Sequence, residues 1–119
     1  MIYLDSAATS FLKPPGVKAA MMQAMNTMSS PGRGAYNAAM LAADKVYECR
    51  ELACRLFNFN KPERVVFTLN ATHALNIAIK SLARRETRVV ISGYEHNSVT
   101  RPLHDISADV SVAAGELFD

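Results

Sequence analysis

The sequence predicts an α/β fold built on a parallel sheet, and three stretches indicate it. Residues 64–79 pass from a β-branched and aromatic run, Val65–Thr68, into a helical pattern, as expected for a strand, a turn and a helix. Similar apolar runs follow at Arg88–Ser92 and Asp109–Ala113, with helical stretches between them. This alternating order is typical of parallel strands joined by right-handed crossovers.

The first third of the chain predicts an extended start, a helix and a loop. The apolar run that ends at Leu4 leads into small residues, which indicate either a loop packed on a helix or backbone lying close to a ligand. Apolar residues from Val17 to Met28 repeat at helical spacing, and we expect this methionine-rich stripe to be core. In the loop 29–34, Arg33 is either a surface charge or a donor to an anion.

Three further helices are predicted. A long helix runs from Ala38 to Phe57, and its two cysteines, Cys49 and Cys54, are expected to be small core or interface residues rather than reactive thiols. A second helix covers residues 72–83, with Thr72 as its N-cap. A third begins near Val99, with Pro102 tolerated in its first turn.

Composition narrows the function classes. The chain has 119 residues, half of them hydrophobic, and a net charge of +2, so one small domain with a core is expected. The basic residues are scattered apart from a cluster near Arg85, which we interpret as a solvated helix end, so no nucleic-acid partner is expected. No apolar run reaches the ~20 residues of a membrane span, and the start is unlike a signal peptide; we expect a cytoplasmic protein without a membrane partner.

The turn Asn70–His73 is a candidate anion site, because a helix that starts directly after a strand presents free N–H groups and the positive end of its dipole. Phosphate is the anion that we expect there, although Thr72 could be only a structural cap. No glycine-rich phosphate fingerprint occurs. Residues 93–98 follow the second strand and should lie at the same sheet edge, where ligands of open α/β sheets bind.

Other chemistries find little support in the sequence. The three histidines, His73, His96 and His104, lack the spacing of metal ligands, so no metal site is predicted. No G-x-S-x-G motif marks a nucleophilic serine. Three strands with their helices would leave a sheet edge with unpaired backbone groups and one face of the sheet poorly covered. We therefore expect the chain to be a fragment of a larger protein.

Three segments in order, Tyr3–Thr9, Asn70–Asn76 and Glu95–Asn97, resemble the amino-terminal part of the class V aminotransferases, and most of all the cysteine desulfurase and selenocysteine lyase group. The resemblance covers essentially the whole chain. It implies a parallel-sheet, three-layer αβα fold, the amino-terminal part of the large domain of a fold-type I, pyridoxal-phosphate-dependent (aspartate aminotransferase-like) enzyme. Residues 1–35 would form an arm and helix segment, and residues 36–119 an incomplete large domain.

The resemblance also implies a cofactor, pyridoxal 5'-phosphate, and the residues that bind it. Ala71 and Thr72 would hold its phosphate, through backbone N–H groups and the threonine hydroxyl, with His73 as a neighbour. His96 would stack on the pyridine ring and act as a catalytic residue in proton transfers, for which a planar imidazole that titrates near neutrality is suited.

The residues near the substrate follow from the first segment and from the loop around Arg33. Ala7 and Ala8 would line the amino-acid pocket, and Ser6 replaces an asparagine that is commoner in the family. The loop around Arg33 resembles a segment that reaches toward the partner's active site in family dimers. Arg33 would therefore contact the substrate or the phosphate, and the parent protein would be a homodimer.

The expected activity of the full-length parent is conversion of L-cysteine to L-alanine and an enzyme-bound persulfide, with a sulfur-acceptor protein as a possible partner. The family's cofactor-binding lysine and nucleophilic cysteine would lie beyond residue 119, so the fragment itself is expected to be inactive. Two alternatives stay open: another class V aminotransferase or pyridoxal-phosphate-dependent lyase, and a non-catalytic α/β module that binds a phosphorylated ligand.

Overall fold

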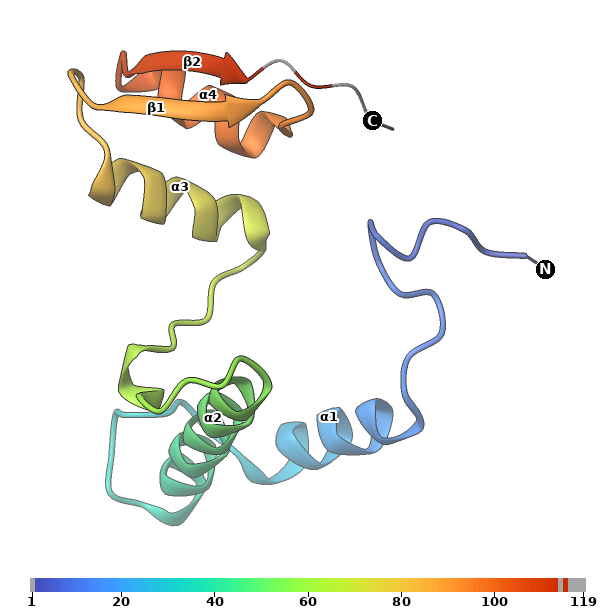
Figure 1. Ribbon diagram of the computed structural model, residues 1–119. Helices are drawn as coiled ribbons and strands as arrows, with labels where there is room; N and C mark the ends of the chain where they lie inside the picture. The colour runs from blue at the N-terminus through green and yellow to red at the C-terminus, as the bar shows by residue number, and fades with distance from the viewer. Residues whose placement is uncertain (1, 114, 116–119) are drawn as a thin grey trace. The chain divides into compact units, whose positions relative to one another are not determined.

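The computed structural model describes residues 2–113 and 115, and the chain divides into two compact units, Met1–Val65 and Val66–Asp119 (Figure 1). The boundary expected near residue 35 is not addressed by this division and stays a prediction. In the described part of the chain, no helix has the length and apolar character needed to cross a membrane.

The first unit is helical. It contains α1 (Pro15–Thr27), α2 (Asn37–Leu56) and the short 3-10 helix η1 (Pro62–Arg64). The proline at the start of α1 suits the first helical turn, where its missing N–H costs no hydrogen bond. The predicted long helix is confirmed by α2, which buries Ala39, Ala42 and Cys54. Cys54 is therefore core, as expected, whereas Cys49 is exposed.

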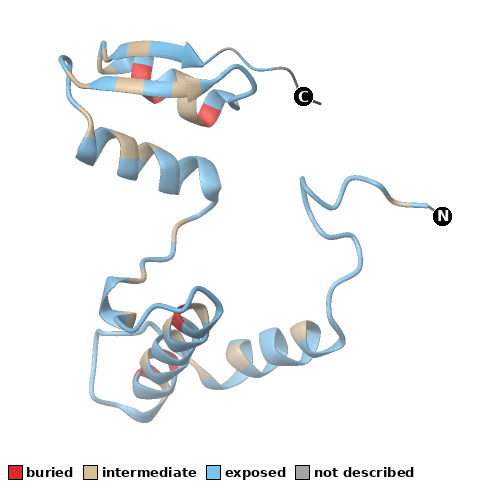
Figure 2. Cartoon of the chain, in the orientation of Figure 1, coloured by how far each residue is buried: buried red, intermediate tan, exposed pale blue. Residues whose placement is uncertain are grey.

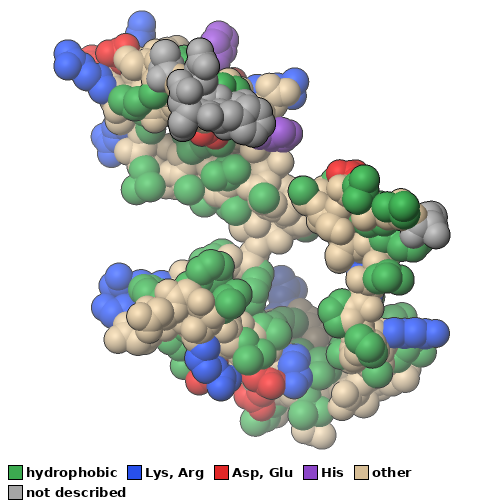
Figure 3. Space-filling model, turned by 45° about the vertical axis from the view of Figure 1, so that its right-hand side comes forward, with side chains coloured by type: hydrophobic (Ala, Val, Ile, Leu, Met, Phe, Trp, Pro, Cys, Tyr) green, Lys and Arg blue, Asp and Glu red, His purple; other side chains and the backbone are tan. Residues whose placement is uncertain are grey.

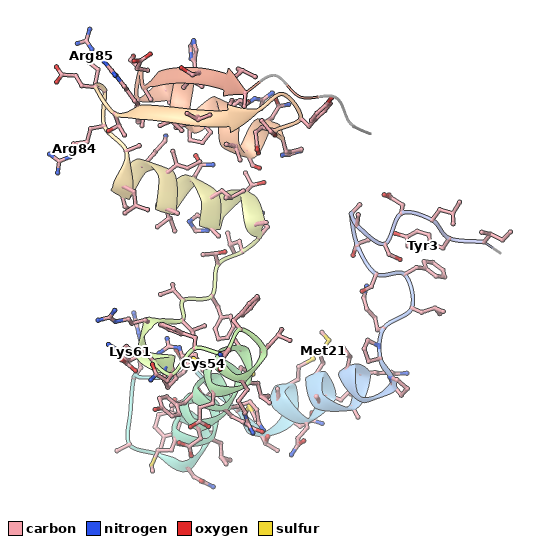
Figure 4. All side chains as sticks on the ribbon, viewed as in Figure 1. Tyr3, Met21, Cys54, Lys61, Arg84 and Arg85 are labelled. Atoms are coloured by element: carbon pink, nitrogen blue, oxygen red, sulfur yellow. The ribbon has the colours of Figure 1, made fainter. Side chains whose placement is uncertain are left out.

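The methionine stripe of α1 was predicted to be core, and this prediction is wrong for the described chain. No residue of α1 is buried, and Met21 and Met25 are 61% and 77% exposed. Figure 2 shows α1 without any buried segment, and Figure 4 labels Met21 on it. The spacing correctly identified a helix with an apolar face, but a face becomes core only when another element covers it.

The second unit contains α3 (Ala71–Leu82), β1 (Arg88–Ser92), α4 (Asn97–Asp105) and β2 (Asp109–Ala113). The strands are parallel, and the register pairs Arg88 with Asp109 and Ser92 with Ala113. Both strands have the predicted bounds, so the α/β class and the parallel pairing are confirmed. The turn between α3 and β1 carries Arg84 and Arg85, which are exposed as expected of a solvated helix end (Figure 4).

The core of the second unit lies between α4 and one face of the sheet. Leu103 is 2% exposed, and it lines a small cavity together with Ile91 and Val110. On the opposite face, Val90 is 72% exposed. The described residues thus form the sheet and the helices on one side of it, and Figure 3 shows hydrophobic side chains at the surface.

Pro102 lies inside α4 rather than in its first turn, which corrects the expected helix start at Val99. The helix begins two residues earlier, at Asn97, because His96 caps it. Pro102 is nearly fully buried. Its ring therefore contributes to the core, and this offsets part of the cost of a missing backbone donor within the helix.

The strand predicted at Val65–Thr68 is also wrong for the described residues, which contain a two-stranded sheet of β1 and β2 only. The run has the β-branched and aromatic composition of a strand, yet Val66 is 73% exposed and Phe67 is 55% exposed. A strand exists only when a neighbouring chain segment accepts and donates its ladder hydrogen bonds. No such segment lies beside it in the described chain.

Helices α3 and α4 pack against each other and run in the same direction (Figure 1). An ion pair joins them near their carboxyl ends, with Lys80 Nζ 2.7 Å from Asp105 Oδ2. The hydrogen bond from Lys80, together with its charge, lowers the pKa of the Asp105 carboxyl below its ordinary value. The pair links the two helices at a solvent-exposed position.

We expect the Lys80 and Asp105 pair to make stability depend on pH in the acid range. Because the folded pKa of Asp105 is lowered, the contribution is fully present above the unfolded value of about 3.9 and is lost as the pH falls through the folded pKa. The Lys80→Met variant should show a flatter dependence of the urea midpoint between roughly pH 5 and pH 2. An unchanged acid-range slope would show that the pair is absent in solution.

Candidate cofactor site

The N-cap of α3 is Asn70, and not Thr72 as predicted. Asn70 is the N-cap, and its side-chain Oδ1 accepts a hydrogen bond of 2.8 Å from the backbone N–H of His73. The Thr68 hydroxyl in turn donates to the Asn70 carbonyl at 2.9 Å. Asparagine is at least as good a cap as threonine, and it stands directly after the apolar run, where the helix can begin earliest.

This cap leaves two donors at the helix start. Asn70 occupies the N–H of His73, while the N–H groups of Ala71 and Thr72 have no hydrogen-bond partner among the described residues. All three residues are exposed. Two free N–H groups, the adjacent Thr72 hydroxyl and the positive helix dipole together form a site that suits a phosphate group.

The second half of the site is the loop between β1 and α4, which is held by hydrogen bonds at both ends. The Ser92 hydroxyl donates to Glu95 Oε1 at 2.9 Å and accepts from the Tyr94 N–H at 3.3 Å. The Tyr94 hydroxyl donates to the Gly115 carbonyl at 2.9 Å. These hydrogen bonds fix the backbone conformation of the loop that leads to His96.

His96 is the N-cap of α4, and its imidazole Nδ1 accepts the Ser98 backbone N–H at 3.1 Å. The residue is exposed, whereas Ser98 is buried. One edge of the ring is thereby fixed to the helix, and its Nε2 has no partner among the described residues. The ring can offer a face or its Nε2 to a bound molecule.

The register of α3 and α4 brings these two helix starts to one end of the unit. Lys80 and Asp105 each stand nine residues beyond Ala71 and His96, respectively, so both starts lie ~13 Å from the ion pair. Because α3 and α4 pack against each other and run in the same direction, Ala71 and His96 lie at the same end of the helix pair. Figure 1 shows both helix starts at the carboxyl end of β1.

Two cavities of this unit lie away from the two helix starts: the one beside Leu103 and a second one along α4. One is lined by Thr100, Arg101, His104 and Asp105 along α4, and none of the site residues lines it. Among residues 2–113 and 115, no group of three His, Cys, Asp or Glu side chains is placed to hold a metal ion. The candidate site is an open surface formed by two helix starts.

Ala7 and Ala8, the predicted substrate-lining residues, are exposed in a turn of the first unit. The Ala8 N–H donates to the Asp5 carbonyl at 3.1 Å. The Tyr3 hydroxyl closes this turn, since it lies 2.7 Å from the Thr9 carbonyl and 3.0 Å from the Asp5 carbonyl. The Tyr3 ring also contacts Phe11, with ring centroids 5.3 Å apart.

We expect the Tyr3→Phe substitution to loosen this turn. The ring contact with Phe11 is kept, but the hydroxyl that braces two carbonyls is lost. Amide hydrogen exchange at Ala8 and Thr9 should become about fivefold to tenfold faster, the effect of losing roughly 1 kcal/mol of hydrogen bonding. The Phe11→Leu variant keeps the hydroxyl and is the control; if it alone speeds the exchange, the turn is held by the ring contact instead.

Arg33, the third predicted substrate contact, is exposed in the loop between α1 and α2. Gly32 has a φ of +80°, which favours glycine, and a Cβ on Gly34 would lie 2.6 Å from the Tyr36 ring. The loop is therefore shaped by both glycines that flank Arg33. The guanidinium forms no ion pair within the described ranges.

Sequence reasoning missed three residues of this arrangement: Asn70, Ser98 and Tyr3. Asn70 could have been found, because asparagine directly after an apolar run is a strong helix-start signal. Ser98 stands two residues after His96, the spacing at which an N-cap side chain receives a backbone N–H. Nothing in the local pattern indicated that Tyr3 would reach back to the turn.

Comparison with known proteins supports a single family. The sequence profile of the aminotransferase class-V family matches residues 2–115. A probable cysteine desulfurase of Methanothermobacter thermautotrophicus is 33% identical over 119 residues, which cover 97% of this chain and 30% of the relative. A probable cysteine desulfurase of Synechocystis is 29% identical, covering 91% of this chain and 27% of the relative.

A solved structure shows the same fold. The apo structure of a cysteine desulfurase from Thermococcus onnurineus matches with a TM-score of 0.80 and 26% identity, covering 97% of this chain and 30% of that one. The predicted fold class is confirmed by this likeness. The chain spans about 30% of the length of the relatives that it matches.

Proposed function

The chain belongs to the aminotransferase class-V family, and we propose that it forms the amino-terminal part of a pyridoxal-phosphate-dependent cysteine desulfurase. The observation that carries this proposal is the pair of helix starts at one end of the second unit. One offers the two free N–H groups of Ala71 and Thr72, and the other offers the His96 imidazole. The relatives named cysteine desulfurases supply the reaction class.

The described residues fit the cofactor's two chemically distinct ends. A dianionic phosphate suits the N–H groups of Ala71 and Thr72 and the Thr72 hydroxyl, with His73 as a neighbour. A planar imidazole suits an aromatic ring, and His96 would lie against it and exchange a proton with the bound substrate. When bound, pyridoxal phosphate supplies an electron sink for bonds at the substrate's α-carbon.

The substrate of the whole enzyme is proposed to be L-cysteine, which would yield L-alanine and an enzyme-bound persulfide. Ala7 and Ala8 would line the amino-acid pocket, where small side chains leave room for a ligand. Arg33 would pair with a carboxylate or phosphate across a homodimer, since a guanidinium binds either group in a bidentate manner. A sulfur-acceptor protein and a cytoplasmic location complete the proposal.

The residues that make the reaction possible are proposed to lie outside this chain. None of its lysines follows a strand in the described residues; Lys80, for example, is within α3 and pairs with Asp105. Cys54 is buried in α2, and Cys49 lies on the same helix rather than on a loop. We therefore expect the 119-residue chain alone to bind the cofactor reversibly and to release no sulfur from L-cysteine.

Absorption spectroscopy with dialysis tests this proposal. The chain is mixed with pyridoxal phosphate, and with pyridoxal as a control that lacks the phosphate. We expect weak binding that requires the phosphate and disappears on dialysis. A new absorption band that survives dialysis would contradict the missing lysine, and equal binding of pyridoxal would contradict the phosphate site.

A further inference from the structure

Ser98 is the one polar residue among the buried side chains of the described chain, with 7% of its surface exposed. It stands at the second position of α4, and like Pro102 and Leu103 of the same helix it is buried. Its hydroxyl lies 2.9 Å from His96 Nδ1, and its backbone N lies 3.1 Å from the same atom. Both polar groups of a buried residue therefore converge on one nitrogen of an exposed imidazole.

The backbone contact decides where the imidazole proton resides. A backbone N–H can only donate, so Nδ1 must present its lone pair and cannot carry a hydrogen. The Ser98 hydroxyl can donate to the same lone pair, which satisfies a buried hydroxyl that otherwise has no partner among the described residues. The neutral ring then carries its single proton on Nε2, the nitrogen that faces away from the helix.

The other polar groups of the loop do not compete for this ring. Glu95, the carboxylate next in the chain, accepts from the Ser92 hydroxyl at 2.9 Å. The Tyr94 hydroxyl donates to the Gly115 carbonyl at 2.9 Å. Within the described residues, the backbone N–H of Ser98 is therefore the group that determines which nitrogen of His96 is protonated, and the hydroxyl beside it fits either tautomer.

We propose that Ser98 positions His96 with two groups: its backbone N–H fixes the tautomer and its buried hydroxyl holds the ring, so that protons are exchanged at Nε2. The catalytic meaning of this arrangement rests on the proposed function, in which His96 contacts the cofactor and the substrate. The arrangement itself does not depend on a bound ligand. A residue that fixes the tautomer makes one nitrogen, rather than either, available for the proton transfer.

Long-range ¹⁵N–¹H correlation spectra of the histidine rings test this inference on the 119-residue chain without any ligand. His96 is assigned with the His96→Asn variant, in which asparagine keeps an N-cap side chain for α4. At a pH where the ring is neutral, we expect the wild-type His96 signals to show the proton on Nε2. Ser98→Pro removes the backbone N–H of this residue at a first-turn position of α4, where proline is tolerated. In this variant the ratio of the Nδ1–H to the Nε2–H form should rise about fivefold, as expected for loss of one hydrogen bond.

Ser98→Ala keeps the backbone N–H and is the control; its ratio should stay close to that of the wild type. A wild-type ring with its proton mainly on Nδ1 would overturn the inference, even if Ser98→Pro did not fold. A ratio that is the same in wild type and folded Ser98→Pro would also overturn it. Since no cofactor is present, these outcomes are separate from success or failure of pyridoxal phosphate binding.

Discussion

The Leu103→Ala substitution should destabilise the second unit by about 3 kcal/mol, within the roughly 2–5 kcal/mol typical of a buried leucine. Leu103 is 2% exposed and lies between α4 and the sheet face that carries Ile91 and Val110. Removing its side chain leaves a cavity next to one that already exists there. Urea unfolding followed by circular dichroism measures the change in the free energy of unfolding.

Leu82→Ala is the matched control for this prediction. Leu82 is the last residue of α3 and is 83% exposed, so the same chemical change should cost less than about 0.5 kcal/mol. Equal destabilisation by both substitutions would mean that α4 does not pack on the sheet in solution. The second unit, and with it the position of His96, would then need another description.

The second large effect is expected from Thr72→Glu, because it should move stability and phosphate binding in opposite directions. Thr72 is the second residue of α3, where a negative charge interacts favourably with the helix dipole by about 0.3–1 kcal/mol. The same carboxylate would repel a phosphate at the N–H groups of Ala71 and Thr72. We expect the affinity for pyridoxal phosphate to fall at least about tenfold, or ~1.4 kcal/mol.

Thr72→Gln has a similar size without the charge and serves as the control. It should lose the contribution of the hydroxyl but keep both backbone N–H groups, so its affinity should lie between those of wild type and Thr72→Glu. Thermal unfolding and equilibrium binding are measured on the same samples. If Thr72→Glu binds as well as wild type, the phosphate does not lie at the start of α3.

The strands that the sequence predicted correctly are those that find their pairing partners within the chain. Arg88–Ser92 and Asp109–Ala113 pair with each other, and their predicted bounds match the structure. Val65–Thr68 has an equally strong strand composition but no neighbour in the described residues. Local composition reports what a segment can form, whereas the hydrogen-bonding partner decides whether it forms.

Whether an apolar helix face is buried also depends on a partner element. The apolar spacing of α1 correctly predicted a helix, yet its methionines are exposed because nothing in the first unit covers them. The stripe of α2 was predicted in the same way, and there Ala39, Ala42 and Cys54 are buried. Periodicity identifies the apolar face of a helix but not the element that packs on it.

At the candidate site, the sequence identified the segments better than the individual roles. The turn at residues 70–73 is the start of a helix, but Asn70 takes the cap and leaves Thr72 one of the free N–H groups. For His96, the resemblance indicated a role in proton transfer, while its position as the N-cap of α4 became visible only in the structure. Capping residues of similar preference can stand two positions apart, so spacing alone could not choose between them.

An NMR titration tests whether the starts of α3 and α4 form a single cofactor site. Amide and histidine-ring chemical shifts of the chain are recorded during titration with pyridoxal phosphate and, separately, with inorganic phosphate. We expect both ligands to shift the amide signals of Ala71 and Thr72, and pyridoxal phosphate also to shift the ring signals of His96. Shifts confined to other residues, or a His96 ring that does not respond to pyridoxal phosphate while Ala71 and Thr72 do, would contradict a single site.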